Sequence, residues 1–292
     1  MRLQVLGGQA LKVGAGSAIG LAQSSWQVIA YLLTRREARA SRDELAETLW
    51  ADHDSAHAKH CFSTALWRLH RAVGPSASRL IIADTEHVAL NWDAPLWVDC
   101  LAMAHRIEPL LKTAPDAVNS DHLRHLCRAV QLYRGPFFAK IDDEWAWIER
   151  QRLRNLYCEG LLKLAFAYAA TGEWLQSIEW AAQLNREEPL REDVHRVLMQ
   201  AYLNSGNRAK AVAQYRLCET VLRDELGVEP MPETQALFRD MVAAGAPASL
   251  SPLKPKPVSD GLAHDLGKLN RVLGTAQRRL ARTLERLRRS ED

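Results

Sequence analysis

The sequence predicts a mainly α-helical protein that opens with a small α+β domain. Strand-like apolar runs broken by glycine occur in the first 97 residues, whereas from Val98 onward apolar residues recur at the spacing of helices. Near the C-terminus, leucines follow a heptad pattern. With 292 residues, 47% hydrophobic and 25% charged, the chain has the composition of an ordinary soluble protein and room for two domains.

Serine-led caps predict the first two helices. Ser24 and Ser25 are suited to cap a helix that begins beside them. Ser41, followed three residues later by Glu44, has the pattern of a capping box and predicts a second helix. The side chains that we expect these helices to bury are Trp26, Ile29, Leu32 and Leu33 in the first and Leu45, Leu49 and Trp50 in the second.

The stretch from Ala56 to Val73 predicts a third helix with two unlike faces. Its apolar face is formed by residues at spacings of four, three and four, namely Phe62, Leu66, Leu69 and Val73. Its opposite face is cationic, hydrogen-bonding and partly aromatic, and carries His57, His60, Thr64, Trp67 and Arg71. Gly74 followed by Pro75 predicts the end of this helix.

Strand signals on either side of these helices complete the first domain. The runs Leu3–Leu6 and Leu11–Val13, each followed by glycine, predict two short strands, and residues 80–90 predict a β-hairpin around a polar tip. Strands, three helices and a terminal hairpin are the parts of a winged helix. In that architecture the third helix enters the DNA major groove and the hairpin contacts the backbone or the minor groove. We therefore predict a winged-helix DNA-binding domain over residues 1–97.

The predicted DNA contacts come mainly from the third helix. The residues expected to face the major groove are His60, Ser63, Thr64, Trp67, Arg68 and Arg71, and weaker candidates for phosphate or hairpin contacts are Lys59, Arg42, Thr85 and His87. The domain holds ten Lys or Arg against nine Asp or Glu, a net charge of +1, which is low because phosphate neutralisation supplies much of DNA affinity. The sequence has no acidic residue from Lys59 to Val73, which favours DNA contact over a merely solvated helix face.

Residues 98–245 predict an all-α, tetratricopeptide-like repeat domain. Four positions of one unit match four of the next at a constant offset of 34 residues, namely Leu164, Tyr168, Gly172 and Ile178 against Leu198, Tyr202, Gly206 and Val212. Each unit reads as a helix, a turn at glycine and a second helix. Stacked repeats expose a concave groove, in which we expect a partner protein, a peptide or a small-molecule ligand. An inert helical spacer is the alternative.

The sequence predicts that the protein is not an enzyme. Gly135-Pro136 must end a helix, and the acidic pair Asp142-Asp143 is suited to cap the next one. The pair is not accompanied by a nucleophile, a metal-ligand set or a phosphate loop. We therefore expect no catalytic residues, no metal site and no cofactor. The scattered cysteines read as small reduced core residues of a cytoplasmic protein: Cys61, Cys100, Cys127, Cys158 and Cys218.

Two further segments follow the repeat domain. Residues 246–259 predict a Pro-rich linker, and residues 260–292 predict a basic heptad helix with eight Lys or Arg against five Asp or Glu. The leucines of its seam are Leu262, Leu266, Leu269, Leu273, Leu280 and Leu287. A homodimeric coiled coil is our first interpretation. Docking of this helix on the protein's own repeat domain, or its contact with a membrane surface or DNA, are the alternatives.

Short motifs with family character are spread over residues 2–240. The first domain carries L-Q-V-L-G-G from Leu3, S-R-D-E-L-A-E-T-L-W from Ser41 and A-L-W-R-L-H-R-A-V-G from Ala65. Further along are W-V-D from Trp97, L-Y-R-G-P-F from Leu132, D-D-E-W from Asp142, E-R-Q-R-L-R from Glu149, P-L-R-E-D-V-H-R-V-L-M from Pro189 and E-L-G-V-E-P-M-P-E-T from Glu225. In this order they resemble the bacterial transcriptional activator family typified by the Streptomyces antibiotic regulatory proteins.

The resemblance implies an OmpR-type winged helix joined to a tetratricopeptide-like bacterial transcriptional activator domain. It also implies a promoter-binding activator that contacts RNA polymerase, often through its sigma subunit. The chain departs from the family at Ser63, Thr64 and Trp67, where relatives tend to carry Arg, a Gln-like residue and a small residue. They also tend to carry a basic residue near Ser25. Arg68 and Arg71 are retained, so DNA binding is still expected, but the operator sequence does not carry over.

Together these features predict a cytoplasmic transcriptional activator that binds double-stranded promoter DNA as a homodimer. The chain has no apolar run approaching the length of a membrane span, and we expect no membrane partner. The alternative is a protein-interaction or ligand-sensing adaptor in which the winged helix no longer binds DNA. The near-neutral charge of residues 1–97 and the presence of Ser63 allow that alternative.

Overall fold

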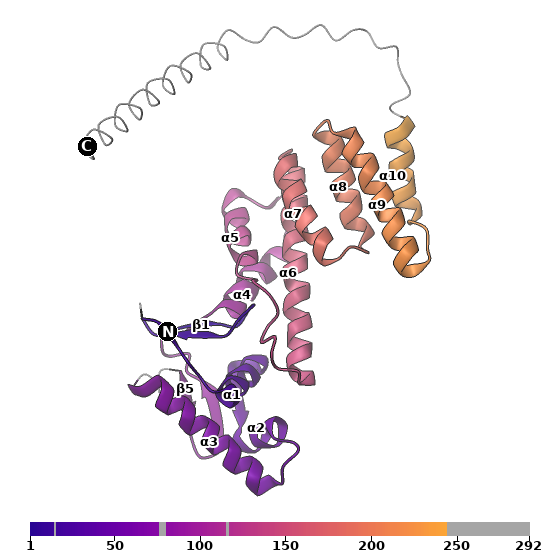
Figure 1. The fold of residues 1–292 in the computed structure, drawn as a ribbon. Coiled ribbons are helices and arrows are strands. Elements are labelled where there is room, and N and C mark those ends of the chain that lie inside the picture. The colour runs from indigo at the N-terminus through magenta and orange to yellow at the C-terminus, as the bar shows by residue number, and fades with distance from the viewer. Residues whose placement is uncertain (15, 76–79, 115–116, 244–292) are drawn as a thin grey trace, which may run out of the picture. The chain divides into compact units, whose positions relative to one another are not determined.

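The computed structural model describes residues 1–14, 16–75, 80–114 and 117–243. Met1–Ala244 forms one compact unit, and its described residues are shown in colour in Figure 1. The predicted linker at 246–259 and the heptad helix at 260–292, with all its seam leucines, lie outside the described residues. The boundary predicted between residues 97 and 98 falls within the compact unit and stays a prediction.

A four-stranded sheet opens the chain. Its strand order is β3-β2-β1-β7, formed by β1 (Arg2–Gln4), β2 (Ala10–Lys12), β3 (Ala18–Ile19) and β7 (Trp97–Val98). β1 and β2 are antiparallel, with Leu3 opposite Leu11, and both side chains are fully buried. β7 runs parallel to β1 and returns the chain to its beginning before the helical region starts. The two predicted N-terminal strands are present, and β3 and β7 join them.

Three helices and a second small sheet follow. The helices are α1 (Gln23–Thr34), α2 (Arg42–Leu49) and α3 (Ser55–Val73), with a short 3-10 turn at Arg36–Ala38. The second sheet has the order β4-β6-β5, formed by β4 (Arg39–Ser41), β5 (Ile81–Ala83) and β6 (His87–Leu90). The predicted hairpin is therefore present, and β4 adds a third strand to it. All seven side chains expected to be buried by α1 and α2 are buried except Trp50, which is half-buried.

The helix caps were predicted with mixed success. Ser41 accepts a hydrogen bond from the backbone N–H of Glu44 at 3.0 Å, as the capping-box pattern requires. The cap predicted at Ser24 and Ser25 is wrong, because both lie inside α1. Ser25 is buried and its hydroxyl donates to the Ala65 carbonyl at 3.1 Å. This hydrogen bond connects α1 to α3.

The rest of the unit is helical. It comprises α4 (Asp99–Leu111), α5 (Ser120–Val130), α6 (Glu144–Ala170), α7 (Trp174–Glu187), α8 (Glu192–Asn204), α9 (Arg208–Leu226) and α10 (Pro232–Ala243). The long α6 contacts both α1 and α7, so it extends from the N-terminal elements to the helical pairs, as Figure 1 shows. Asp143 stands at the N-cap of α6, but its side chain makes no capping bond, which corrects the predicted role of the acidic pair.

The 34-residue repeat is confirmed by matching turns. Gly172 and Gly206 adopt φ values of 77° and 79°, a left-handed backbone that glycine allows without strain. In the first turn the Glu173 N–H donates to the Tyr168 carbonyl at 2.9 Å, and in the second the Asn207 N–H donates to the Tyr202 carbonyl at 2.8 Å. The turn after α6 and the turn after α8 are therefore built in the same way, as expected of two stacked helical hairpins.

The joint between the N-terminal elements and the helical region is a dense set of backbone contacts. We define it as residues 5–8 facing residues 134–141. Leu6 and Phe137 form an antiparallel bridge, and the Gly7 N–H donates to the Pro136 carbonyl at 3.2 Å. A Cβ added at Gly7 would lie 2.4 Å from the Arg134 carbonyl oxygen, so only glycine fits there.

Two charged side chains fasten this joint. The Arg150 guanidinium donates to the carbonyls of Phe137, Phe138 and Ile141 at 3.0, 2.9 and 2.7 Å. The carboxylate of Asp99 accepts from the backbone N–H of Val5 at 3.0 Å and of Leu6 at 3.2 Å. Three charge-assisted bonds to one loop make Arg150 the main polar anchor of the joint. The ring of Tyr31 on α1 also meets the edge of Trp145 on α6, with ring centroids 5.2 Å apart.

Candidate nucleic-acid interface

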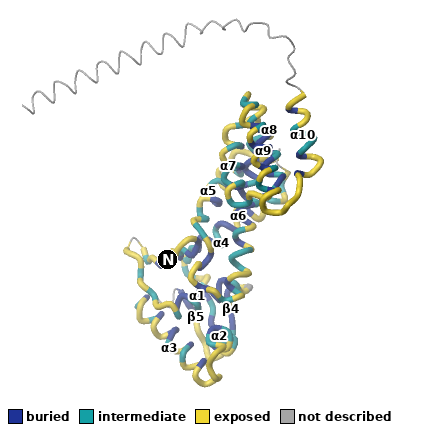
Figure 2. Tube along the Cα trace, turned by 45° about the vertical axis from the view of Figure 1, so that its right-hand side comes forward, coloured by how far each residue is buried: buried dark blue, intermediate teal, exposed yellow. Residues whose placement is uncertain are grey.

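Helix α3 has the two faces that its sequence predicts. Its buried residues are Ala58, Phe62, Ala65, Leu66, Leu69 and Val73, so all four members of the predicted apolar face are buried. This face packs on α1 and α2, and Figure 2 shows exposed and buried positions alternating along α3. Asp54 caps the helix by accepting from the His57 N–H at 2.9 Å, and Gly74, with φ at 65°, ends it.

We define the outer face of α3 as the six predicted groove-facing residues: His60, Ser63, Thr64, Trp67, Arg68 and Arg71. All are exposed except Thr64, which is half-buried. Trp67 has 57% of its surface exposed, which is high for so large an apolar side chain. The Arg71 guanidinium lies over the Trp67 ring, 5.2 Å from its centroid, and Arg68 makes no ion pair with any described residue. The outer face therefore combines free positive charge with an exposed aromatic ring.

Two members of the predicted contact set have partners within the protein. The Ser63 hydroxyl donates to the Lys59 carbonyl one turn back at 2.8 Å, so it is engaged by its own helix. The Lys59 ammonium pairs with the Asp43 carboxylate of α2 at 3.0 Å. Both charged side chains are more than half exposed, so the pair is weak in water but still offsets the positive charge of Lys59.

Arg42 connects α3 to the hairpin. Its guanidinium lies over the Phe62 ring, 5.1 Å from the centroid, and Nη1 donates to the Asp84 carbonyl at 3.4 Å. The backbone N–H of Arg42 also donates to the Glu86 carbonyl at 2.8 Å. Arg42 is half-buried, and its guanidinium is engaged with the hairpin tip and with Phe62. Its predicted phosphate contact stays a prediction.

The hairpin tip is shaped by an aspartate. The Asp84 carboxylate accepts from the backbone N–H groups of His87 at 2.6 Å and Glu86 at 2.8 Å, and these bonds hold the pKa of Asp84 below its usual value. The turn leaves Thr85 exposed and His87 half-buried. Asp84 places a negative charge at the tip, which opposes phosphate contact by Thr85 and His87.

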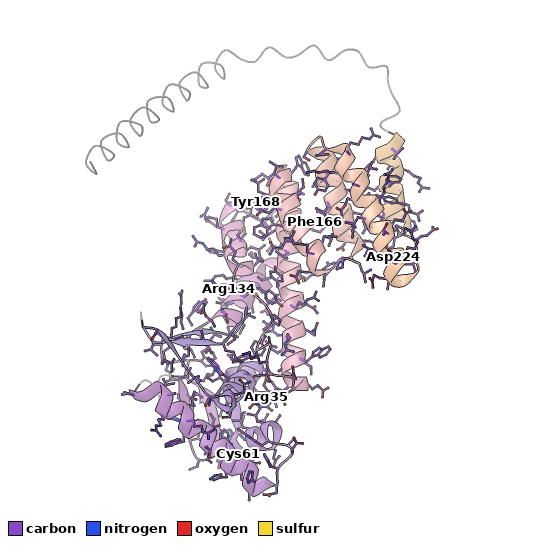
Figure 3. All side chains as sticks on the ribbon, viewed as in Figure 1. Arg35, Cys61, Arg134, Phe166, Tyr168 and Asp224 are labelled. Atoms are coloured by element: carbon purple, nitrogen blue, oxygen red, sulfur yellow. The ribbon has the colours of Figure 1, made fainter. Side chains whose placement is uncertain are left out.

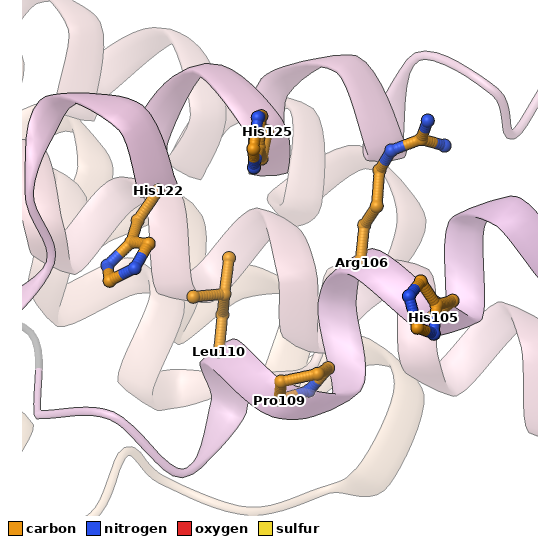
Figure 4. A pocket seen from close by; sticks show the side chains of 6 residues that line it. All are labelled: His105, Arg106, Pro109, Leu110, His122 and His125. Atoms are coloured by element: carbon orange, nitrogen blue, oxygen red, sulfur yellow. The ribbon is translucent and has the colours of Figure 1, made fainter.

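A pocket of about 320 Å³ lies between α4 and α5 (Figure 4). It is lined by His105, Arg106, Pro109, Leu110, His122 and His125, and the Nδ1 atom of His122 is buried without a hydrogen-bond partner among the described residues. The sequence does not predict this pocket, because its histidines come from two helices and follow no motif spacing.

Comparison with known proteins gives a consistent picture. Residues 104–241 match the family model of the bacterial transcriptional activator domain. The regulatory protein AfsR of Streptomyces coelicolor is 29% identical over 266 residues, covering 85% of this chain and 26% of AfsR. The transcriptional regulatory protein MoaR1 of Mycobacterium tuberculosis is 26% identical over 232 residues, covering 74% of this chain and 70% of MoaR1. The chain thus spans about a quarter of the length of AfsR.

A solved structure shares the fold. Mycobacterium tuberculosis EmbR, in complex with a low affinity phosphopeptide, matches with a TM-score of 0.66 at 22% identity, covering 83% of this chain and 65% of that chain. The predicted fold class, mainly α with a small N-terminal sheet region, is confirmed. None of the described helices is long and apolar enough to cross a membrane.

Proposed function

This chain carries a bacterial transcriptional activator domain and is a homologue of the regulators AfsR, MoaR1 and EmbR, and we propose that it is a DNA-binding transcriptional activator. In this proposal residues 1–97 act as a winged helix, with α3 in the major groove of promoter DNA. Residues 98–245 contact RNA polymerase or another partner. The protein acts in the cytoplasm.

The outer face of α3 is the observation that carries the proposal. It offers Arg68, Arg71, His60 and Trp67 to solvent on a helix whose other side is fully packed. Arginine can donate two hydrogen bonds to a guanine edge, and an aromatic ring can pack on thymine methyl groups. The contact of Arg42 with both Phe62 and Asp84 supports a hairpin held in register with this helix.

Dimerisation is part of the proposal because the basic contacts of one α3 are few. A DNA-binding domain with a net charge of +1 gains little from phosphate neutralisation alone. Two copies joined through the heptad helix at 260–292 would read two half-sites, and the second contact would be intramolecular. Specific recognition would then be a property of the dimer.

A protein-interaction or ligand-sensing adaptor is the second candidate. The Lys59–Asp43 ion pair and the engaged hydroxyl of Ser63 favour it, because both reduce what α3 can offer to DNA. In an adaptor, the groove of the helical repeats or the pocket between α4 and α5 would bind a peptide or a small molecule.

Binding of the full chain to random and to promoter DNA at several salt concentrations distinguishes the two functions. If the full chain binds DNA, its affinity for random duplex should fall as the salt concentration rises, as counterion release requires. Arg71→Ala should weaken binding to the preferred site by roughly 1–3 kcal/mol and relax one base position. Arg124→Ala is the matched control, because this exposed arginine of α5 pairs only with Asp121 in the described residues.

Two outcomes would reject the DNA-binding proposal. One is an absence of binding to duplex DNA at low salt, which would favour the adaptor. The other is unchanged binding by both Arg68→Ala and Arg71→Ala, which would remove α3 as the recognition element.

A further inference from the structure

Two histidines and a cysteine gather at the start of α3. His53 lies in the turn before the helix, His57 in its first turn, and Cys61 one turn further on, where Figure 3 labels it. One ring nitrogen of each histidine and the sulfur of the cysteine lie within 4.8 Å of one another. Both histidines are exposed and Cys61 is half-buried, so solvent reaches the cluster.

The local fold places these three side chains together. His57 and Cys61 are four residues apart, so they lie one above the other on the same side of the helix. His53 is positioned by the N-cap, since Asp54 turns the chain by accepting the His57 N–H at 2.9 Å. As a result the rings of His53 and His57 stand with centroids 4.6 Å apart, at an angle of 53°.

We propose that His53, His57 and Cys61 bind a borderline-soft transition-metal ion of the zinc class. Imidazole nitrogen and thiolate sulfur are ligands that Zn²⁺ prefers, whereas Mg²⁺ and Ca²⁺ prefer oxygen. With Zn–N bonds of about 2.0 Å and Zn–S bonds of about 2.3 Å, the donors of a tetrahedral site lie roughly 3.3–3.7 Å apart. The donors of the cluster reach that separation by small side-chain rotations of exposed residues.

The site has three protein ligands and an open fourth position. A water molecule or an external group completes the tetrahedron, as in zinc sites with three protein ligands. On binding, the Cys61 thiol loses its proton to solvent, because the thiolate is the form that ligates metal. The ion joins the turn after α2 to the first two turns of α3. It therefore stabilises the folded protein according to its concentration and affinity.

This proposal departs from the expectation of no metal site. The five cysteines lack C-x-x-C spacing, and no histidine lies at ligand spacing from two of them, so a zinc site was not predicted. The proposed site instead combines two histidines with one cysteine. The spacing His53-x3-His57-x3-Cys61 becomes a site only when the chain turns at Asp54 and the helix starts there. The metal proposal does not depend on DNA binding, since the ligands lie outside the six residues of the outer face.

Titration of the tag-free, reduced and chelator-treated full chain with Co²⁺ tests the proposal. We expect one equivalent to bind and to give the near-ultraviolet charge-transfer absorption of a thiolate–Co²⁺ bond, which Zn²⁺ then removes by competition. His53→Ala, His57→Ala and Cys61→Ser should each weaken Co²⁺ binding by roughly tenfold or more, because each removes one of three protein ligands.

Two controls separate this site from incidental binding. His60→Ala removes an exposed histidine of the same helix, and Cys127→Ser removes a half-buried thiol on α5; both should bind Co²⁺ like the unchanged protein. The melting temperature without metal should be similar for all the histidine variants, whose side chains are exposed. A missing thiolate–Co²⁺ band overturns the proposal. So does a band that survives Cys61→Ser.

Discussion

The joint and the outer face of α3 are contrasting regions of one compact unit: the joint is an internal contact, and the outer face is exposed to solvent. At the joint, two backbone segments pair directly, and Arg150 and Asp99 use their charges on main-chain groups. On the outer face, Arg68 is without an ion pair among the described residues, and Trp67 is more than half exposed. At the joint, the backbone groups bonded by Arg150 and Asp99 are satisfied within the protein, whereas at α3 several polar side chains are left available.

The residues of the joint stabilise the fold, whereas the residues of the outer face of α3 are available to bind a ligand. Charges that donate to buried carbonyls are costly to remove, because their partners are then left without hydrogen bonds. Exposed side chains contribute little to stability, so they are free to serve a ligand. The motifs L-Y-R-G-P-F and E-R-Q-R-L-R contain Gly135 and Arg150, so each contributes a residue to the contacts of the joint.

Gly7→Ala should have the largest effect on stability, because it places a Cβ where the two backbone segments of the joint approach each other most closely. The new Cβ would lie 2.4 Å from the Arg134 carbonyl oxygen, and Gly7 has φ at +78°, so clash and backbone strain add. We expect the free energy of unfolding to fall by roughly 3 kcal/mol or more, measured by chemical denaturation. Gly8→Ala is the matched control, since its Cβ meets nothing within 4 Å. Equal stability of the two variants would contradict the close approach.

Arg150→Ala should have the next largest effect on the free energy of unfolding. It removes the guanidinium donor of the Phe137 and Ile141 carbonyls and one of the two donors of the Phe138 carbonyl, which keeps the N–H of Ile141. It also frees Phe138, whose φ of 39° is unfavourable for a non-glycine residue. We expect a loss of about 2–3 kcal/mol in the free energy of unfolding. Arg152→Ala, two residues on, removes only partly exposed ion pairs with Glu149 and Glu108 and should cost less than about 1 kcal/mol. The reverse ranking would show that the joint does not rely on Arg150.

Asp99 gives the joint a pH dependence. Burial raises the pKa of Asp99, although N–H bonds from Leu6, Val5 and Cys100 oppose the rise. A raised pKa in the folded state means that its contribution to stability is fully present below the unfolded pKa of about 3.9. That contribution is lost as pH rises through the folded pKa. The unfolding free energy of the unchanged protein, minus that of Asp99→Asn, should therefore decrease across this interval. A difference that increases with pH would contradict the burial argument.

Sequence patterns were sufficient at several places where a single helix or turn decides the outcome, although the cap predicted at Asp142-Asp143 is wrong. The buried face of α3 follows from spacing alone, and the Ser41 cap follows from a side chain that bonds three residues ahead. The glycine turns at Gly172 and Gly206 follow from a repeat visible in the chain itself. Each of these predictions depends on residues close together in sequence.

Patterns failed where distant segments compete for a side chain. Ser25 had the chemistry of a cap, but the Ala65 carbonyl, 40 residues away, takes its hydroxyl. Lys59 was expected to be available to phosphate, and Asp43 of another helix pairs with it. Arg42 is held between Phe62 and Asp84. The roles of the predicted DNA contacts stay predictions, because tertiary contacts decide which of them are available.

Trp67→Ala should change stability least, and this small effect is what would mark the outer face of α3 as a binding surface. A buried tryptophan such as Trp26, with 5% of its surface exposed, should cost about 3–5 kcal/mol when replaced by alanine. Trp67 is 57% exposed and contacts Arg71 of its own helix, so we expect a change within about 0.5 kcal/mol in the free energy of unfolding.

If Trp67 packs on thymine methyl groups, the same substitution should weaken DNA binding although folding is unchanged. A loss of more than about 1 kcal/mol of stability in the free full-length protein would mean that Trp67 is covered by another part of the chain, and the contrast with the joint would then fail at this position.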